Sequence, residues 1–206
     1  MKKAIFYSIL LSVIIAVSCK EKKVEPSPNK SVSLKYTIDL KNTVLNWTAY
    51  KTTDKVPVKG VFQEVKIINE KTSTSVGGVL NGLEFEIPVS SIFSKDSIRD
   101  WKLREYFFGA MKNSLKLTGK FHTEENGKGK ISLTMNGLSK DLPFTFSVDG
   151  DDIILNATMD LDTWQAQAAI ASLNVVCNDK HKGADGISKT WNEVSIGAHI
   201  KVVSKE

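Results

Sequence analysis

The chain has 206 residues, of which 41% are hydrophobic and 25% are charged, and its formal net charge is +5 at pH 7. This composition is that of an ordinary globular protein; it excludes a disordered chain or a collagen-like repeat, and the length suits one domain with appendages. Basic residues are mixed with acidic ones, as in residues 20–23, so we expect a solvated surface and no nucleic-acid partner.

The N-terminus has the layout of a cleaved export signal. Lys2 and Lys3 precede a short apolar segment, residues 5–17, and small residues continue up to Cys19. A membrane-spanning helix would need about 20 apolar residues, which is more than this segment offers. A Cys directly after a small residue resembles a bacterial lipobox, so residues 1–18 are predicted to be a signal peptide. An ordinary secretory signal followed by a chance cysteine is the alternative.

Residues 19–33 are polar and contain two prolines, which predicts a tether rather than a folded segment. If Cys19 is acylated, each buried CH₂ contributes about 0.8 kcal/mol to membrane binding, and several chains anchor the protein stably. The expected location is therefore the bacterial cell envelope, periplasmic or facing the outer membrane, with acylated Cys19 in the membrane. Residues 34–206 are expected to form the folded domain.

From residue 34 onward, apolar and polar residues alternate in segments of strand length. Eight or nine such amphipathic strands follow one another, mostly joined by short turns, and they must bury one common face. Most gaps are too short for the crossover helices that parallel strands require, so an antiparallel barrel or sandwich is predicted. The segments are 36–40, 44–50, 58–68, 83–89, 115–122, 131–136, 142–148, 153–161 and 194–202.

Two segments have helical spacing instead. Residues 97–111 place four apolar side chains at helical intervals, and Ser97 and Asp100 fit a capping pair. Residues 162–181 carry two neighbouring apolar stripes, and Asp162 can cap the start. We expect both helices to cover ends of the barrel.

The sequence offers no catalytic constellation. It contains three histidines and no Gly-x-Ser-x-Gly elbow, phosphate-binding Gly loop or His-Glu-x-x-His helix. Cys177 and His181 are spaced to face one metal ion from a helix, but two ligands are too few for structural zinc. A core thiol followed by a histidine at a helix C-terminus is the competing interpretation. We expect a non-catalytic protein with no metal and no cofactor.

An eight-stranded barrel is just wide enough to be filled by side chains or to hold one slim ligand. Its predicted lining is uncharged, which suits a long apolar chain, since each methylene removed from water contributes about 0.8 kcal/mol. A structural or interaction module with a solid core is the alternative. The candidate ligand-binding residues are Trp47, Phe62, Phe85, Leu117, Phe121, Leu133, Met135, Phe144 and Phe146 in the interior, with Trp101, Phe107 and Phe108 in a lid formed by the first helix.

Four motifs follow one another between residues 34 and 203: Tyr36-Thr-Ile38-Asp39; Val58-x-Gly60-x-Phe62; Ile98-Arg99-Asp100 leading to the paired aromatics Phe107-Phe108; and the Gly-rich hairpin of residues 129–140. Their order and spacing resemble the YceI-like family, the lipid- or polyisoprenoid-binding barrels of the bacterial envelope. The resemblance implies an eight-stranded, lipocalin-like antiparallel barrel that holds an extended isoprenoid or other lipid along its axis.

The chain departs from the family pattern in two places. Asn113-Ser114-Leu115 stands where an aromatic residue and a proline usually start the strand after the first helix. Residues 162–191 replace the late Arg-containing segment near the barrel mouth. This replacement makes the identity of the ligand, and even its binding, depend on whether the segment caps or fills the cavity.

Overall fold

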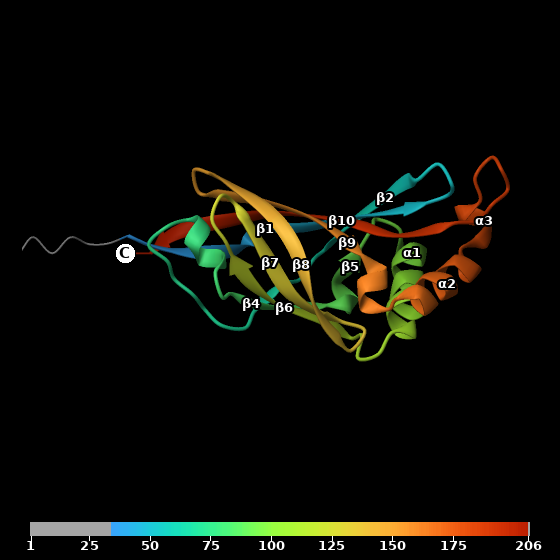
Figure 1. Ribbon diagram of the computed structural model, residues 1–206, viewed down its shortest axis with the longest axis horizontal. Helices are drawn as coiled ribbons and strands as arrows, with labels where there is room; N and C mark the ends of the chain where they lie inside the picture. Colours follow the sequence, from blue (N-terminus) through green and yellow to red (C-terminus); the bar gives the residue numbers. More distant parts are fainter. Residues whose placement is uncertain (1–33, 206) are drawn as a thin grey trace, which may run out of the picture. The chain divides into compact units, whose positions relative to one another are not determined.

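One antiparallel sheet of ten strands forms the body of residues 34–205, which are the residues described by the computed structural model. The sheet is rolled into an all-β half-barrel, with neighbouring strands in the order β3-β4-β6-β7-β8-β9-β10-β1-β2-β5 (Figure 1). The predicted signal peptide, Cys19 and tether lie outside the described residues. The strands are β1 (Lys35–Lys51), β2 (Val56–Phe62), β3 (Lys66–Ile67), β4 (Glu84–Pro88), β5 (Ile92–Phe93), β6 (Lys116–Thr123), β7 (Lys128–Met135), β8 (Leu138–Asp149), β9 (Asp152–Asp160) and β10 (Thr190–Lys205).

The predicted strand count of eight is corrected to ten: the predicted strand 58–68 is interrupted, β5 lies outside every predicted strand, and the predicted segments 36–40 and 44–50 form the single strand β1. Residues 63–65 separate β2 from β3, and the 3₁₀ turn η2 (Val89–Ser91) separates β4 from β5. Pro88 is the last residue of β4, and the N–H of Val89 in the following turn still donates to the carbonyl of Leu115 at 3.0 Å. The short strands are the two edges of the sheet: β3 pairs with β4 at one edge, and β5 pairs with β2 at the other.

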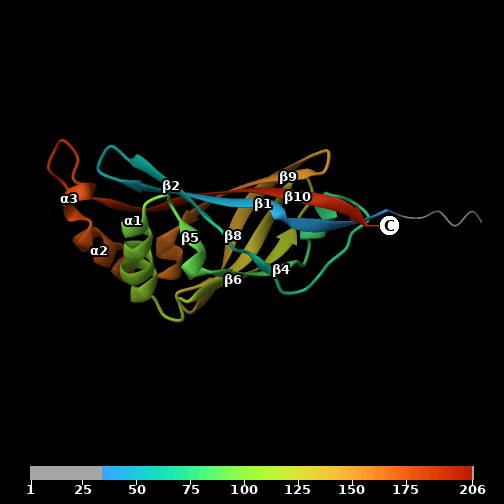
Figure 2. The ribbon, with the colours of Figure 1, turned by 180° about the vertical axis from the view of Figure 1, so that it is seen from behind.

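The two longest strands, β1 and β10, pair along almost their whole length. Their register runs from Lys35 opposite Lys205 to Lys51 opposite Thr190, with two irregularities on the way. In Figures 1 and 2 they lie side by side in both views and reach the end of the domain where the helices gather. This ladder therefore connects the body of the half-barrel to its helical end.

The predicted alternation of buried and exposed side chains is confirmed for the central strands. On β9 the side chains of Ile153, Leu155, Ala157 and Met159 are buried, whereas the residues between them are exposed. The opposite face carries charges in exposed ion pairs such as Lys120 with Glu84, whose N–O distance is 2.9 Å. Exposed pairs of this kind add little stability, so the fold depends on its buried apolar face.

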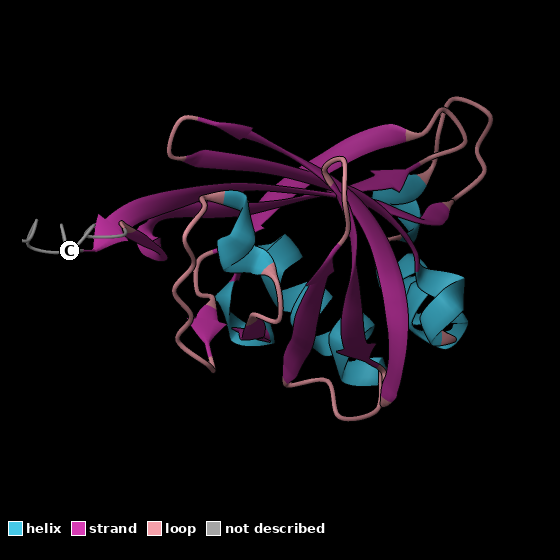
Figure 3. Cartoon of the chain, turned by 60° about the vertical axis from the view of Figure 1, so that its left-hand side comes forward, coloured by secondary structure: helices cyan, strands magenta, loops and turns pink. Residues whose placement is uncertain are grey.

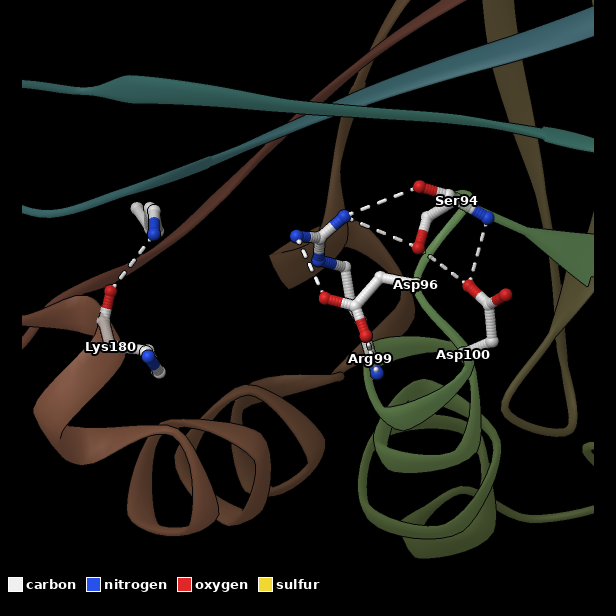
Figure 4. A network of polar contacts seen from close by, with 6 residues as sticks. Ser94, Asp96, Arg99, Asp100 and Lys180 are labelled. Carbon is white, nitrogen blue, oxygen red and sulfur yellow. Dashed lines mark hydrogen bonds and ion pairs between the residues drawn. The ribbon is translucent and has the colours of Figure 1, made fainter.

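The first predicted helix is present, in three consecutive pieces: α1 (Ser97–Lys102), a π-turn η3 (Leu103–Phe107) and a 3₁₀ turn η4 (Phe108–Ala110). Its cap differs from the prediction by one residue, because the carboxylate of Asp96 accepts the N–H of Arg99 at 3.0 Å. Asp100 is instead buried and accepts both the N–H and the hydroxyl of Ser94, at 2.8 and 2.6 Å (Figure 4). These bonds hold the first turn of α1 against β5.

The second predicted helix is divided into η5 (Leu161–Trp164), α2 (Gln167–Val176) and α3 (Asn178–His181). The left-handed backbone of Gln165, with φ of +54°, separates η5 from α2. Figure 3 shows one bent and twisted sheet with the helical segments against one side of it. Within residues 34–205, no helix combines the length and the apolar character required to cross a bilayer.

Candidate functional site

An apolar cavity of about 120 Å³ lies inside the half-barrel. A buried water needs only about 15 Å³, so side chains do not fill this interior completely. The lining contains no charged residue, and Thr43 and Asn46 are its polar members. It consists of Ile38, Leu40, Thr43, Leu45, Asn46, Phe62, Val65, Ile67, Leu83, Phe85, Ile87, Leu117, Phe121, Ile131, Leu133, Leu142, Leu155, Met159, Ile196, Ala198 and Ile200.

A second apolar cavity of about 100 Å³ adjoins the first on the side of the helices. Both cavities are lined by Phe62, Leu117, Met159 and Ile196, so these four side chains form the boundary between them. The helical segments contribute Leu103, Phe107, Phe108, Leu161 and Leu173 to the second lining. The two cavities together form a narrow apolar space from the centre of the sheet to its helical end.

A row of aromatic rings crosses the interior from β4 through β6 to β8. The ring centroids of Phe85 and Phe121 are 5.3 Å apart, and those of Phe121 and Phe144 are 5.5 Å apart. Gly119 lies opposite Phe85 in the sheet, and a Cβ there would overlap the phenyl ring. The glycine therefore gives the ring room to lie against the strand, which keeps it inside the half-barrel.

Nine of the twelve predicted ligand-binding residues line one or both cavities. Phe62 and Leu117 line both; Phe85, Phe121 and Leu133 line the first; Trp47, Phe107, Phe108 and Met135 line the second. Phe144 is buried in the aromatic row and Phe146 packs against it, but neither lines either of the two apolar cavities.

The structure does not bring Trp101 to the interior. Its side chain is 46% exposed and packs edge-on against Tyr106, with ring centroids 5.4 Å apart. The predicted lid therefore reaches the cavities through Phe107 and Phe108. Phe107 is the last residue of the π-turn and Phe108 follows it, and this turn changes the direction in which the helix presents its side chains.

Residues 162–191, which depart from the family pattern, cover the helical end of the interior. Trp164 is fully buried and donates its indole N–H to the carbonyl of Leu133 at 3.0 Å. Leu173 and Trp191 line the second cavity. Leu173 belonged to an apolar stripe of the predicted helix, but the stripe alone did not indicate which side chain would face the cavity.

A cleft of about 400 Å³, lined by apolar side chains and by several basic ones and called the basic cleft below, opens next to the second cavity. Its lining includes Cys177 and His181, the pair considered as metal ligands. The imidazole Nδ1 of His181 is 2.7 Å from the hydroxyl of Thr190, and burial raises the pKa of the Cys177 thiol. The described part of the chain holds no group of three or more His, Cys, Asp or Glu residues that could bind a metal ion.

The domain is similar to known proteins in both sequence and fold. The family described as YceI-like domain matches residues 36–202. A polyisoprenoid binding domain from Saccharophagus degradans, implicated in plant cell wall breakdown, has the same fold, with a TM-score of 0.60 and 12% identity over 84% of this chain and 99% of that one. BcnA of Burkholderia cenocepacia matches with a TM-score of 0.50 and 15% identity over 81% of this chain and 99% of its own. No curated protein matches the sequence.

Proposed function

The chain belongs to the YceI-like domain family, and from this premise we propose that its half-barrel binds one long apolar chain, such as a polyisoprenoid, without altering it chemically. The observation that carries the proposal is the pair of adjoining cavities, whose linings contain no charged side chain. An apolar cavity of this kind is poorly hydrated, so an apolar chain gains contacts there without displacing strongly bound water.

The mechanism is burial at equilibrium. Each methylene group that enters the cavities contributes about 0.8 kcal/mol to binding. The four residues shared by both linings would hold the chain at its middle, while Phe107 and Phe108 close the helical end. Similarity to a polyisoprenoid-binding domain of the same fold supports an isoprenoid as the apolar chain.

A variant that fills the first cavity tests this proposal. Ala198 lines that cavity, so Ala198→Leu adds three carbon atoms to the apolar space and should weaken binding by about tenfold or more. Ala168 is exposed on α2, so Ala168→Leu is the matched control and should bind like the wild type. Binding is measured by isothermal titration of delipidated protein with farnesol. Equal affinities in all three proteins, or no uptake by any of them, would overturn the proposal.

We further propose that the domain is anchored in the cell envelope through acylated Cys19. The lipobox-like sequence before that residue supports the proposal, and the chain contains two cysteines, which makes a direct test possible. Cells that express the protein with radioactive palmitate should label the wild type and Cys177→Ser but not Cys19→Ser. Label that persists in Cys19→Ser, or is absent from the wild type, contradicts the anchor.

A further inference from the structure

Four basic side chains from three separate elements line the basic cleft at the helical end. Lys51 comes from the end of β1, Arg99 and Lys102 from α1, and Lys180 from α3. The lining includes one carboxylate, Asp96, which caps α1 and pairs with Arg99 at 3.4 Å. The cleft therefore carries more positive than negative charge.

Two of these ammonium groups are held by backbone carbonyl oxygens. Lys51 Nζ donates to the carbonyl of Lys180 at 3.0 Å, and Lys102 Nζ donates to the carbonyl of Val176 at 2.6 Å. Within residues 34–205, neither ammonium group forms an ion pair with a carboxylate. Because a carbonyl carries no net charge, the positive charge of both lysines remains uncompensated.

Arg99 is positioned at the wall of the cleft by several partners. Its guanidinium donates to the carbonyl and the hydroxyl of Ser94, at 3.4 and 3.3 Å, and contacts Asp96 (Figure 4). Figure 4 also shows Lys180 on the neighbouring helix. The guanidinium is thus oriented before any ligand arrives, which lowers the entropic cost of binding an oxyanion.

The imidazole of His181 reports on the electrostatic potential in this cleft. Burial, together with the positive charges of Lys51, Lys102 and Arg99, lowers the pKa of His181 to about 4. Burial raises the pKa of the Cys177 thiol at the end of α2, and the same three cations oppose this rise. Three positive groups from β1 and α1 therefore lie close to both the imidazole and the thiol, and they make the electrostatic potential there positive.

The cleft is continuous with the apolar interior. Trp47, Ala49, Leu103, Leu173 and Thr190 line both the cleft and the second cavity. A molecule that extends through both spaces would have its apolar part among uncharged side chains and its polar end among the cations. This arrangement matches an amphiphile with one anionic end.

We propose that the cleft binds the anionic headgroup, a phosphate or a carboxylate, of an amphiphile whose apolar tail occupies the two cavities. This inference rests on the proposed function and narrows its ligand from any apolar chain to an acidic one. Lys51 and Lys102 are the principal headgroup ligands, because their ammonium groups would exchange a neutral carbonyl for an oxyanion.

The test compares farnesyl phosphate, farnesol and inorganic phosphate as ligands of three proteins. The wild type should bind farnesyl phosphate more tightly than farnesol by about tenfold or more, as expected for charge-assisted hydrogen bonds. The double variant Lys51→Gln/Lys102→Gln should lose this preference and keep its affinity for farnesol. Lys112 and Lys140 are exposed and lie outside the cleft, so Lys112→Gln/Lys140→Gln removes the same charge and should behave like the wild type.

The outcomes separate the headgroup from the tail. Equal affinities of the wild type for farnesyl phosphate and farnesol would overturn the headgroup site and leave the proposed function standing. Binding of inorganic phosphate without binding of farnesol would overturn the proposed function and show a site for free anions. An equal loss of both farnesyl ligands in the lysine variant would show a structural role for the lysines and contradict the proposal.

A second measurement follows His181 directly by NMR. An oxyanion beside the imidazole would offset Lys51, Lys102, Arg99 and Lys180, and would therefore raise the pKa of His181 from about 4. Farnesyl phosphate should produce this rise, whereas farnesol should not. An unchanged pKa of His181 at a saturating concentration of farnesyl phosphate would place the headgroup outside the cleft and overturn the proposal.

Discussion

Trp47 lies directly opposite Gly60 in the ladder between β1 and β2, and its indole ring covers the glycine so closely that a Cβ at position 60 would overlap the ring. The indole N–H donates to the carbonyl of Val61 at 3.3 Å, which holds the ring across β2. Trp47 lines both the second cavity and the basic cleft, so this cross-strand pair forms part of the wall where the two spaces meet.

Gly60→Ala should destabilise the protein by about 1–3 kcal/mol, the usual cost of overpacking. The backbone carbonyl of Phe93 lies 2.7 Å from the position of the added Cβ, so the strand cannot shift away from the ring. Gly197→Ala is the control, because the nearest atom to its Cβ would be 3.9 Å away. Urea unfolding measures both variants, and equal midpoints would show that the ring moves aside without cost.

Phe144→Asp should lower the free energy of unfolding by several kcal/mol, because it places an unpaired carboxylate in the aromatic row. Phe144 is 4% exposed and its ring meets that of Phe121 edge-on. Val148→Asp lies on the same strand at a position that is 47% exposed, and should change stability by about 0.5 kcal/mol or less. Similar thermal unfolding of both variants would contradict the burial of Phe144.

Asp100→Ala should destabilise the protein by about 1–3 kcal/mol, because it leaves the N–H and hydroxyl of Ser94 without their buried acceptor. It should also weaken binding of farnesyl phosphate more than binding of farnesol, since Ser94 helps to position Arg99. Asp179→Ala removes an exposed carboxylate from a neighbouring helix and serves as the control. Unfolding curves measure the change in stability, and titrations with both ligands measure the change in affinity. Equal effects of Asp100→Ala and Asp179→Ala would contradict the role of Asp100 in holding Ser94.

Acid should destabilise the protein partly through His181. Its pKa is about 4 in the folded chain against an ordinary value of 6.5, so between these pH values the unfolded chain binds a proton that the folded chain does not. The free energy of unfolding therefore falls as the pH is lowered through this window. His181→Gln should show a shallower fall between about pH 7 and pH 4 in denaturant titrations. An identical slope in both proteins would contradict the low pKa.

Which face of each central strand is buried could be predicted from the order of residues alone. Successive side chains of a strand point to opposite sides, so the alternation around Phe85, Phe121 and Phe144 assigned them to the interior before any pairing was known. The positions of the two helical regions also follow from residues close together in the chain, and the family follows from the order and spacing of motifs along it.

The strand breaks, the exposed position of Trp101 and the basic cleft could not be predicted before the packing of the elements was known. The 3₁₀ turn η2 after β4 and the π-turn after α1 change the direction of the chain by amounts that periodicity does not encode. Lys51, Lys102 and Lys180 each have the appearance of an ordinary surface charge in the sequence, and they gather only because β1, α1 and α3 meet at one end of the half-barrel. Alternation is a property of neighbouring residues, whereas a binding site requires side chains far apart in sequence to converge, and that depends on strand register and helix packing.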